Sequence, residues 1–150
     1  MNFHLFPVLT VFVLSLALLQ FVKQFMDLSD SCIEPLTVLR AFIEKKIVIA
    51  EIYDLVAGRV SEMMLQSYAS HVNAMCKNIL LSFLVKYPMT PAITQKSINF
   101  LIKNMEYTYE EGRATVYEVV KIITRSFPDT VLAFFGEILF VSLLVNLINE

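Results

Sequence analysis

Glycine, proline, histidine and cysteine are all scarce in this chain of 150 residues. With three glycines, five prolines and no low-complexity run, the sequence contains no flexible linker between domains. The glycines Gly58, Gly112 and Gly136 stand apart from one another, which excludes a glycine-rich loop that cradles phosphate groups. We therefore expect a single segment, residues 1–150, in which regular elements follow one another directly.

The residues that usually bind metals are too few and too scattered to form a site. The histidines are His4 and His71, and the cysteines are Cys32 and Cys76. No His, Cys and carboxylate residues share the spacing of metal ligands, and no cofactor motif is present, so we predict neither kind of site. Both cysteines lie in apolar helical patterns, which favours buried thiols in a reducing compartment over the alternative of a disulfide.

No group of residues predicts catalysis either. Glu110 and Glu111 are adjacent, and neighbouring residues of a helix point about 100° apart, so we interpret them as charges at a helix start rather than as a catalytic pair. We expect Arg113, at the same helix start, to form a surface or inter-helix salt bridge. The sequence predicts no catalytic residue and no enzyme.

The chain is unusually apolar and its charge is unevenly distributed. Hydrophobic residues make up 57% of the sequence, against roughly 45–50% in typical soluble domains. A partner, a membrane or neighbouring repeats should therefore cover part of it. The net charge of −2 argues against nucleic-acid binding by charge alone. Residues 68–128, however, carry seven basic and four acidic side chains, a weak indication of a positive face.

Apolar residues recur at helical spacing in the middle of the chain. They are Val72, Met75, Cys76, Ile79, Leu80, Phe83 and Leu84, and then Val116, Val119, Val120, Ile123 and Phe127. Both patterns end in an aromatic residue before proline, at Tyr87–Pro88 and Phe127–Pro128, about 40 residues apart, which is typical of a helical repeat. We interpret Met63, Met64 and Met75 as core packing rather than as an adaptable binding surface.

Turn and capping residues predict where the helices begin and end. We expect helices from Ser31 or Pro35 to Ile47, from Ala50 to Ser67, from Ser70 to Lys86, from Thr90 to Met105 and from Thr108 to Arg125. The first two should form an antiparallel pair. Lys45 and Lys46 should lie in the last turn of the first helix, where cations complement the helix dipole.

Ser31 with Glu34 could form a capping box at the first of these helices. Three of the later helix starts also depend on hydroxyl side chains as N-caps. Ser70 is a plausible cap, and Thr90 before Pro91 is a clearer one, because proline at the first helical position loses no hydrogen bond. Thr108 and Glu111 have the spacing of a capping box.

Both ends of the chain are apolar on nearly every side. The run from Leu5 to Met26 and the helix expected from Val131 to Ile148 suit buried inner helices of a helical array. The alternative is a small helical membrane protein with spans near residues 5–22 and 131–147, although the first is short of the ~20 residues that a span needs. Because complete solenoids end in repeats with a polar outer face, we expect this sequence to be part of a longer one.

Several stretches together resemble the family of very large HEAT-repeat proteins called "down-regulated in metastasis", component 20 of the small-subunit processome. The stretches are Glu44–Lys46, Glu51–Leu55, Ser61–Met64, Ser67, Cys76, Leu80–Pro88, Tyr107–Arg113 and Ser126–Pro128. The resemblance covers roughly residues 21–149, and Tyr-Glu-x-Gly-Arg followed by Phe-Pro is its most specific part. Where the family tends to have Val-Arg, this chain has Val72-Asn73.

The resemblance implies both a fold and a function. The fold is all-α, a HEAT/armadillo-like α-solenoid segment of stacked antiparallel helix pairs. The function is that of a nucleolar, non-catalytic scaffold that associates with a small nucleolar ribonucleoprotein, pre-ribosomal proteins and the small-subunit rRNA precursor, and that supports 18S rRNA processing. It implies no cofactor and no small-molecule substrate, and it does not indicate which residues bind partners.

Overall fold

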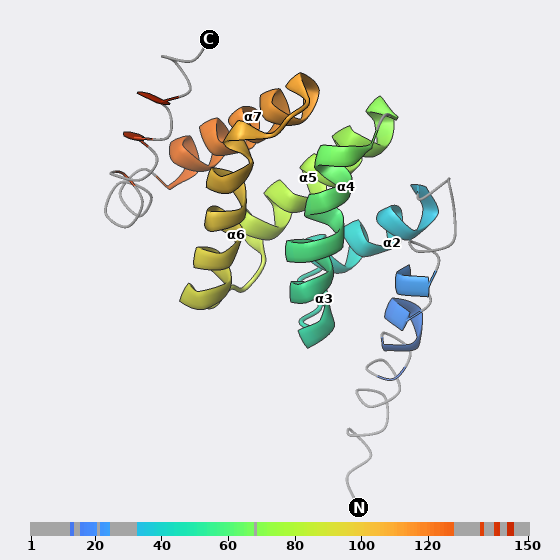
Figure 1. Cartoon of the computed structure of the whole chain (residues 1–150). Helices are drawn as coiled ribbons and strands as arrows, with labels where there is room; N and C mark the ends of the chain where they lie inside the picture. The colour runs from blue at the N-terminus through green and yellow to red at the C-terminus, as the bar shows by residue number, and fades with distance from the viewer. Residues whose placement is uncertain are drawn as a thin grey trace, which may run out of the picture.

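The computed structural model describes residues 13, 16–20, 22–24, 33–67, 69–127, 136, 140–141 and 144–145, and all regular structure within them is helical. The helices labelled in Figure 1 are α2 (Ile33–Glu44), α3 (Ala50–Leu55), α4 (Ser61–Gln66), α5 (Ser70–Lys86), α6 (Pro91–Lys103) and α7 (Glu110–Ser126). A π-helical segment, η1 (Val56–Val60), joins α3 to α4, and a 3₁₀ turn, η2 (Asn104–Glu106), follows α6.

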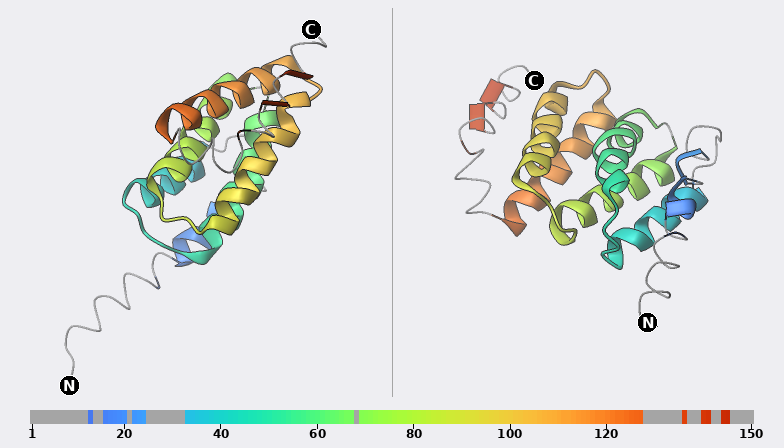
Figure 2. Two further views of the ribbon diagram at one scale, coloured as in Figure 1. Left: turned by 90° about the vertical axis from the view of Figure 1, so that its left-hand side faces the viewer. Right: turned by 90° about the horizontal axis from the view of Figure 1, so that it is seen from below.

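The helices are arranged in two layers. Helices α2, α5 and α7 lie side by side in one layer, with α5 packed against both neighbours. The continuous helix α3–η1–α4 and helix α6 form the other layer, where η1 contacts α6 (Figure 2). Since the chain alternates between the layers, it builds stacked helix pairs. This arrangement confirms the predicted all-α, HEAT/armadillo-like solenoid segment.

One apolar core lies between the layers. Its fully buried side chains include Leu36, Leu39, Ile43, Ile52, Met64, Ile79, Leu80, Phe83, Leu101 and Met105. In α2 and α5, which contribute several of them, they fall at helical spacing, so the spacing read from the sequence does mark the core face. Cys76 is fully buried as a thiol, as predicted, and Met63 and Met75 pack against the core while partly exposed. Cys32 lies outside the described residues.

The helix expected from Ala50 contains a π-helical segment that the apolar spacing does not reveal. At Ser61 both the backbone N–H and the side-chain hydroxyl donate to the carbonyl of Val56, the latter at 2.9 Å. Ser61 is buried, and its hydroxyl is thereby satisfied inside the fold. Gly58 lies within the π segment, and a Cβ there would meet no atom within 4 Å.

One of the three predicted hydroxyl caps is confirmed and two are wrong. The Thr90 hydroxyl accepts from the N–H of Ile93 at 3.4 Å, with Pro91 at the first helical position. Helix α5 instead begins at Ser70 itself, with Ala69 as N-cap and no side chain as cap. The N–H of Ala69 donates to the Ser67 hydroxyl at 3.3 Å.

Helix α7 starts one residue later than the predicted capping box requires. Its N-cap is Tyr109 and no side chain caps it, so Thr108 and Glu111 form no capping box. The carbonyl of Thr108 instead accepts a hydrogen bond from Arg113, which fixes the turn before the helix.

The end of α2 also differs from the prediction. The helix ends at Glu44, and Lys45 and Lys46 form the following turn instead of its last turn. Lys46 has a left-handed backbone with φ of 53°, a conformation that ends a helix. Ile47 therefore lies in the loop, half-buried, and not on the helix.

Most of the two apolar ends lies outside the described residues, as do Ser31, Pro128 and Asp129. Within the part that is described, Leu19 and Val22 are buried, whereas Val13 and Leu18 are exposed. Phe140, Val141, Leu144 and Val145 are exposed as well. Among the residues described, no helix has both the length and the apolar character that a membrane span needs. The proposed spans near 5–22 and 131–147 fall largely in the part that is not described.

Candidate functional site

The first aromatic–proline pair, Tyr87–Pro88, has a structural role. The Tyr87 hydroxyl at the end of α5 accepts from the N–H of Ile49 at 3.2 Å and donates to the carbonyl of Ile47 at 2.8 Å. It thus fixes the loop between α2 and α3. Burial raises the pKa of Tyr87 above its ordinary value of 10.0, and the bond from Ile49 opposes this to a smaller extent.

A second tyrosine, Tyr53, contacts the same Tyr87–Pro88 pair. The Tyr53 hydroxyl donates to the Pro88 carbonyl at 2.6 Å, and the rings of Tyr53, Phe83 and Tyr87 form an edge-to-face and stacked cluster. The Tyr87 hydroxyl and the Pro88 carbonyl both bind groups of this chain. The pair therefore explains part of the family pattern without offering a binding site.

The turn before α7 carries the most specific family stretch and is held by two unusual contacts. Gly112 is buried, and a Cβ on it would lie 2.6 and 2.9 Å from ring atoms of Tyr107 and 3.2 Å from the Leu65 carbonyl oxygen. Arg113 Nη1 donates to the carbonyls of Tyr107 and Thr108 at 2.9 and 3.2 Å. The predicted salt bridge of Arg113 is wrong, because its guanidinium binds backbone carbonyls among the described residues.

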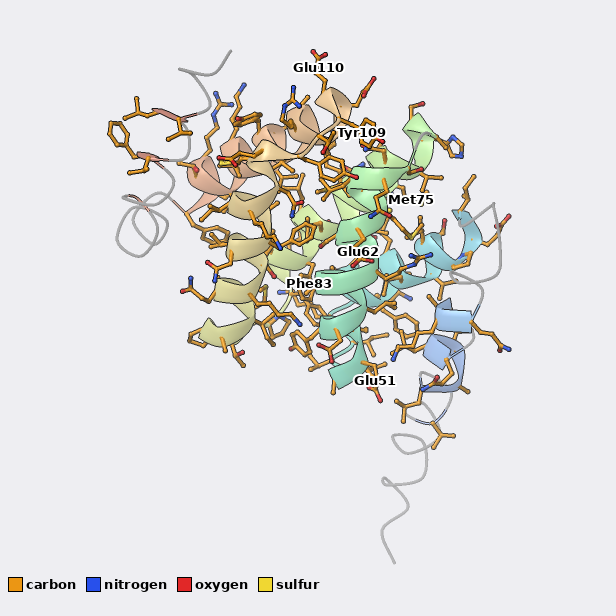
Figure 3. The ribbon with its side chains drawn as sticks, viewed as in Figure 1. Glu51, Glu62, Met75, Phe83, Tyr109 and Glu110 are labelled. Atoms are coloured by element: carbon orange, nitrogen blue, oxygen red, sulfur yellow. The ribbon has the colours of Figure 1, made fainter. Side chains whose placement is uncertain are left out.

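A pocket of about 680 Å³ opens beside this turn, at the end of α4 and the starts of α5 and α7. It is lined by Leu65, Gln66, Ser67, Ser70, Asn73, Tyr107, Tyr109, Glu111, Gly112 and Thr115. Figure 3 shows Tyr109 and Glu110 together at this end of the molecule, with Glu51 at the opposite end. Three separate segments therefore build one concave surface.

Asn73 fixes the floor of the pocket by joining all three helices. Its amide Nδ2 donates to the carbonyl of Met64 in α4, and its Oδ1 accepts from the Thr115 hydroxyl of α7 at 3.4 Å. The single hydrogen of the Thr115 hydroxyl is shared with the Glu111 carbonyl, which lies closer, at 2.8 Å. At the position where the family tends to have arginine, this chain thus has a neutral cross-link inside the fold.

The remaining polar groups of the pocket are available to a ligand. Within the described part of the chain, the side chains of Gln66, Ser70 and Glu111 have no hydrogen-bond partner. The rings of Tyr107 and Tyr109 meet edge to face, with centroids 5.8 Å apart, and Tyr109 is 55% exposed. The sequence marked the Tyr107–Arg113 stretch, but not the residues of α4 and α5 that face it.

Apart from Glu111, which lines the pocket, the other residues singled out in the sequence form no site among the described residues. His71 lies exposed at the start of α5, and Glu110 and Glu111 occupy the first turn of α7, as expected for charges at a helix start. The described residues include no group of three or more histidine, cysteine, aspartate or glutamate side chains placed to hold a metal ion. His4 lies outside them.

Comparison with known proteins returned two relatives with the same name. The chain is 30% identical over 114 residues, 76% of its length, to "U3 small nucleolar RNA-associated protein 20" of Schizosaccharomyces pombe. It is 29% identical over 91 residues, 60% of its length, to the protein of that name from Saccharomyces cerevisiae. The chain spans about 4% of the length of each relative. No family model and no solved structure matches it.

Both relatives carry, in their name, the number of the processome component that the sequence stretches indicated. The chain is therefore a homologue of a short segment of U3 small nucleolar RNA-associated protein 20, and its resemblance to the component-20 family is confirmed.

Proposed function

We propose that this chain is part of a non-catalytic scaffold of the small-subunit processome, which supports 18S rRNA processing and small ribosomal subunit biogenesis in the nucleolus. The observation that carries the proposal is the match over 76% of the chain to a relative named for its association with U3 small nucleolar RNA. Its partners would be pre-ribosomal proteins and the small-subunit rRNA precursor.

The two-layered helical architecture supports a scaffold role. Stacked helix pairs bury a continuous core between the layers and leave the helix ends and connecting turns free to contact other molecules. A function of this kind depends on non-covalent contacts spread over a large surface. We further propose that the chain is one segment of a longer solenoid. The comparisons favour this scaffold over the small membrane protein considered as an alternative.

The test is co-purification of the intact, tagged protein from cells that express it. We expect U3 small nucleolar RNA and small-subunit rRNA precursors to be enriched relative to an untagged strain, as measured by quantitative reverse transcription PCR at low salt. A tagged nucleolar protein outside this particle is the specificity control. Failure to enrich either RNA, or recovery of the protein in a detergent-dependent membrane fraction, would contradict the proposal.

A further inference from the structure

The pocket between α4, α5 and α7 combines aromatic rings, a carboxylate and neutral polar groups, and no lysine or arginine lines it among the described residues. Its volume of about 680 Å³ lies within the roughly 300–1,000 Å³ of typical ligand pockets. We propose that this pocket binds a basic side chain, arginine above all, of an extended segment of a partner protein. The inference deepens the proposed scaffold function by naming the chemistry of one partner.

The charges around the pocket favour a cation. Glu111 lines it, and Glu106 and Glu110 are exposed neighbours in the chain of the two pocket tyrosines. The cation of this turn, Arg113, points its guanidinium at the carbonyls of Tyr107 and Thr108 and is committed to holding the turn. The Glu111 carboxylate in the pocket, with two more exposed carboxylates close by in the chain, attracts a basic side chain and repels the phosphates of a nucleic acid.

The aromatic lining favours a guanidinium in particular. Tyr109 is 55% exposed, and Tyr107 is held edge-on to it by the close approach of Gly112. A guanidinium can lie flat on a tyrosine face while it donates two parallel hydrogen bonds to a carboxylate such as that of Glu111. The Gln66 and Ser70 side chains, which have no partner in the described residues, can then bind the backbone of the same peptide.

Nuclear magnetic resonance of the 150-residue chain tests the proposal directly. The probes are two glycine–serine peptides with blocked ends that differ in one central residue, the charged arginine in one and the neutral glutamine in the other, together with single-stranded oligouridylate. The amide signal of Gly112 reports on the pocket, and that of Gly58, in η1, serves as internal reference. We expect the arginine peptide to shift the Gly112 signal and to leave the Gly58 signal unchanged. Its affinity should be about tenfold above that of the glutamine peptide.

Variants separate the roles of charge and ring. Glu111→Gln and Tyr109→Ala should each weaken the arginine peptide about tenfold, whereas Tyr109→Phe, which keeps the ring, should bind like the parent. Glu51→Gln is the matched control, because Figure 3 places Glu51 at the opposite end of the helices. An unmoved Gly58 signal verifies that each variant is folded.

Two results would overturn the proposal. One is equal binding of the two peptides, or binding of the arginine peptide that neither Glu111→Gln nor Tyr109→Ala weakens. The other is that oligouridylate shifts the Gly112 signal and the arginine peptide does not. That result would mean that the pocket binds nucleic acid. Because this assay contains no U3 RNA, its failure is distinguishable from failure of the intact protein to co-purify with that RNA.

Discussion

The ring of Tyr107 occupies the place that a side chain on Gly112 would need. A Cβ at Gly112 would lie 2.6 Å from the ring, and 3.2 Å from the backbone oxygen of Leu65. Tyr107 and the glycine five residues later therefore form one packing unit within the Tyr107–Arg113 stretch.

We predict that Gly112→Ala destabilises the chain by about 1–3 kcal/mol, because the added methyl group forces the ring or the helix to shift in a packed site. Gly58→Ala is the matched control. Its Cβ meets no atom within 4 Å, so the higher helix propensity of alanine should leave stability unchanged or raised by about 0.5–1 kcal/mol. Urea unfolding followed by circular dichroism measures both, and equal effects of the two substitutions would refute the packing explanation.

The Tyr87 hydroxyl should contribute more to stability than that of Tyr53. Tyr87→Phe leaves the N–H of Ile49, a residue only 2% exposed, without its partner, at a cost of about 1–3 kcal/mol. Tyr53→Phe removes one hydrogen bond at an exposed carbonyl, that of Pro88, and should cost about 0.5–1.5 kcal/mol. Chemical denaturation of the two variants side by side measures both losses of stability. A larger loss of stability for Tyr53→Phe than for Tyr87→Phe would contradict the prediction.

The raised pKa of Tyr87 predicts a stability change at alkaline pH. Burial favours the neutral hydroxyl in the folded state, so above the ordinary value of 10.0 the folded chain binds this proton more tightly than the unfolded chain. The contribution is fully present below about pH 10 and is lost as the pH rises through the folded-state pKa. In Tyr87→Phe the free energy of unfolding should fall less steeply as the pH rises above 10.0 than in the parent. Parallel slopes would show that Tyr87 does not titrate differently in the two states.

How far the sequence predicts this fold depends on which interactions leave a local pattern. Apolar spacing marks the core face from Leu36 to Ile123, and the Thr90–Pro91 pair marks a helix start correctly, because both signals act within one helix. The π-helical segment at Val56–Val60, in contrast, leaves no recognisable signal in the apolar spacing. The Thr108 cap fails because α7 begins one residue later, with Tyr109 as its N-cap, and spacing alone does not indicate that shift.

The candidate site shows the same division between local and distant contacts. The family stretch Tyr107–Arg113 was visible in the sequence, whereas Gln66, Ser70 and Asn73 were not singled out as its partners. These residues reach the pocket only because the two layers bring the end of α4 and the start of α5 against α7. Contacts between distant segments depend on how helices pack, and one sequence alone does not encode that in any short pattern.

The ion pair between Lys77 of α5 and Glu118 of α7, at 2.6 Å, should stabilise only weakly. Half of the Glu118 side chain is exposed, so water screens the attraction. We predict that Glu118→Gln costs about 0–1 kcal/mol at low salt and nothing measurable at 1 M sodium chloride. Unfolding curves at the two salt concentrations provide the measurement. A cost that persists at high salt would mean that Glu118 acts through packing and not through its charge.

Asn73 should prove the most sensitive polar residue of the pocket. Asn73→Asp removes the donor to the Met64 carbonyl and places a carboxylate against that oxygen, while the Thr115 hydroxyl can still donate to it. We expect a loss of about 1–3 kcal/mol at neutral pH, partly recovered near pH 3, where the protonated carboxyl can donate again. Ser70→Ala is the control, because the Ser70 side chain lines the same pocket without any hydrogen bond among the described residues. Denaturation at both pH values measures the difference, corrected for the parent chain. If Asn73→Asp were no more harmful than Ser70→Ala, the three helices would be held at this point by apolar packing alone.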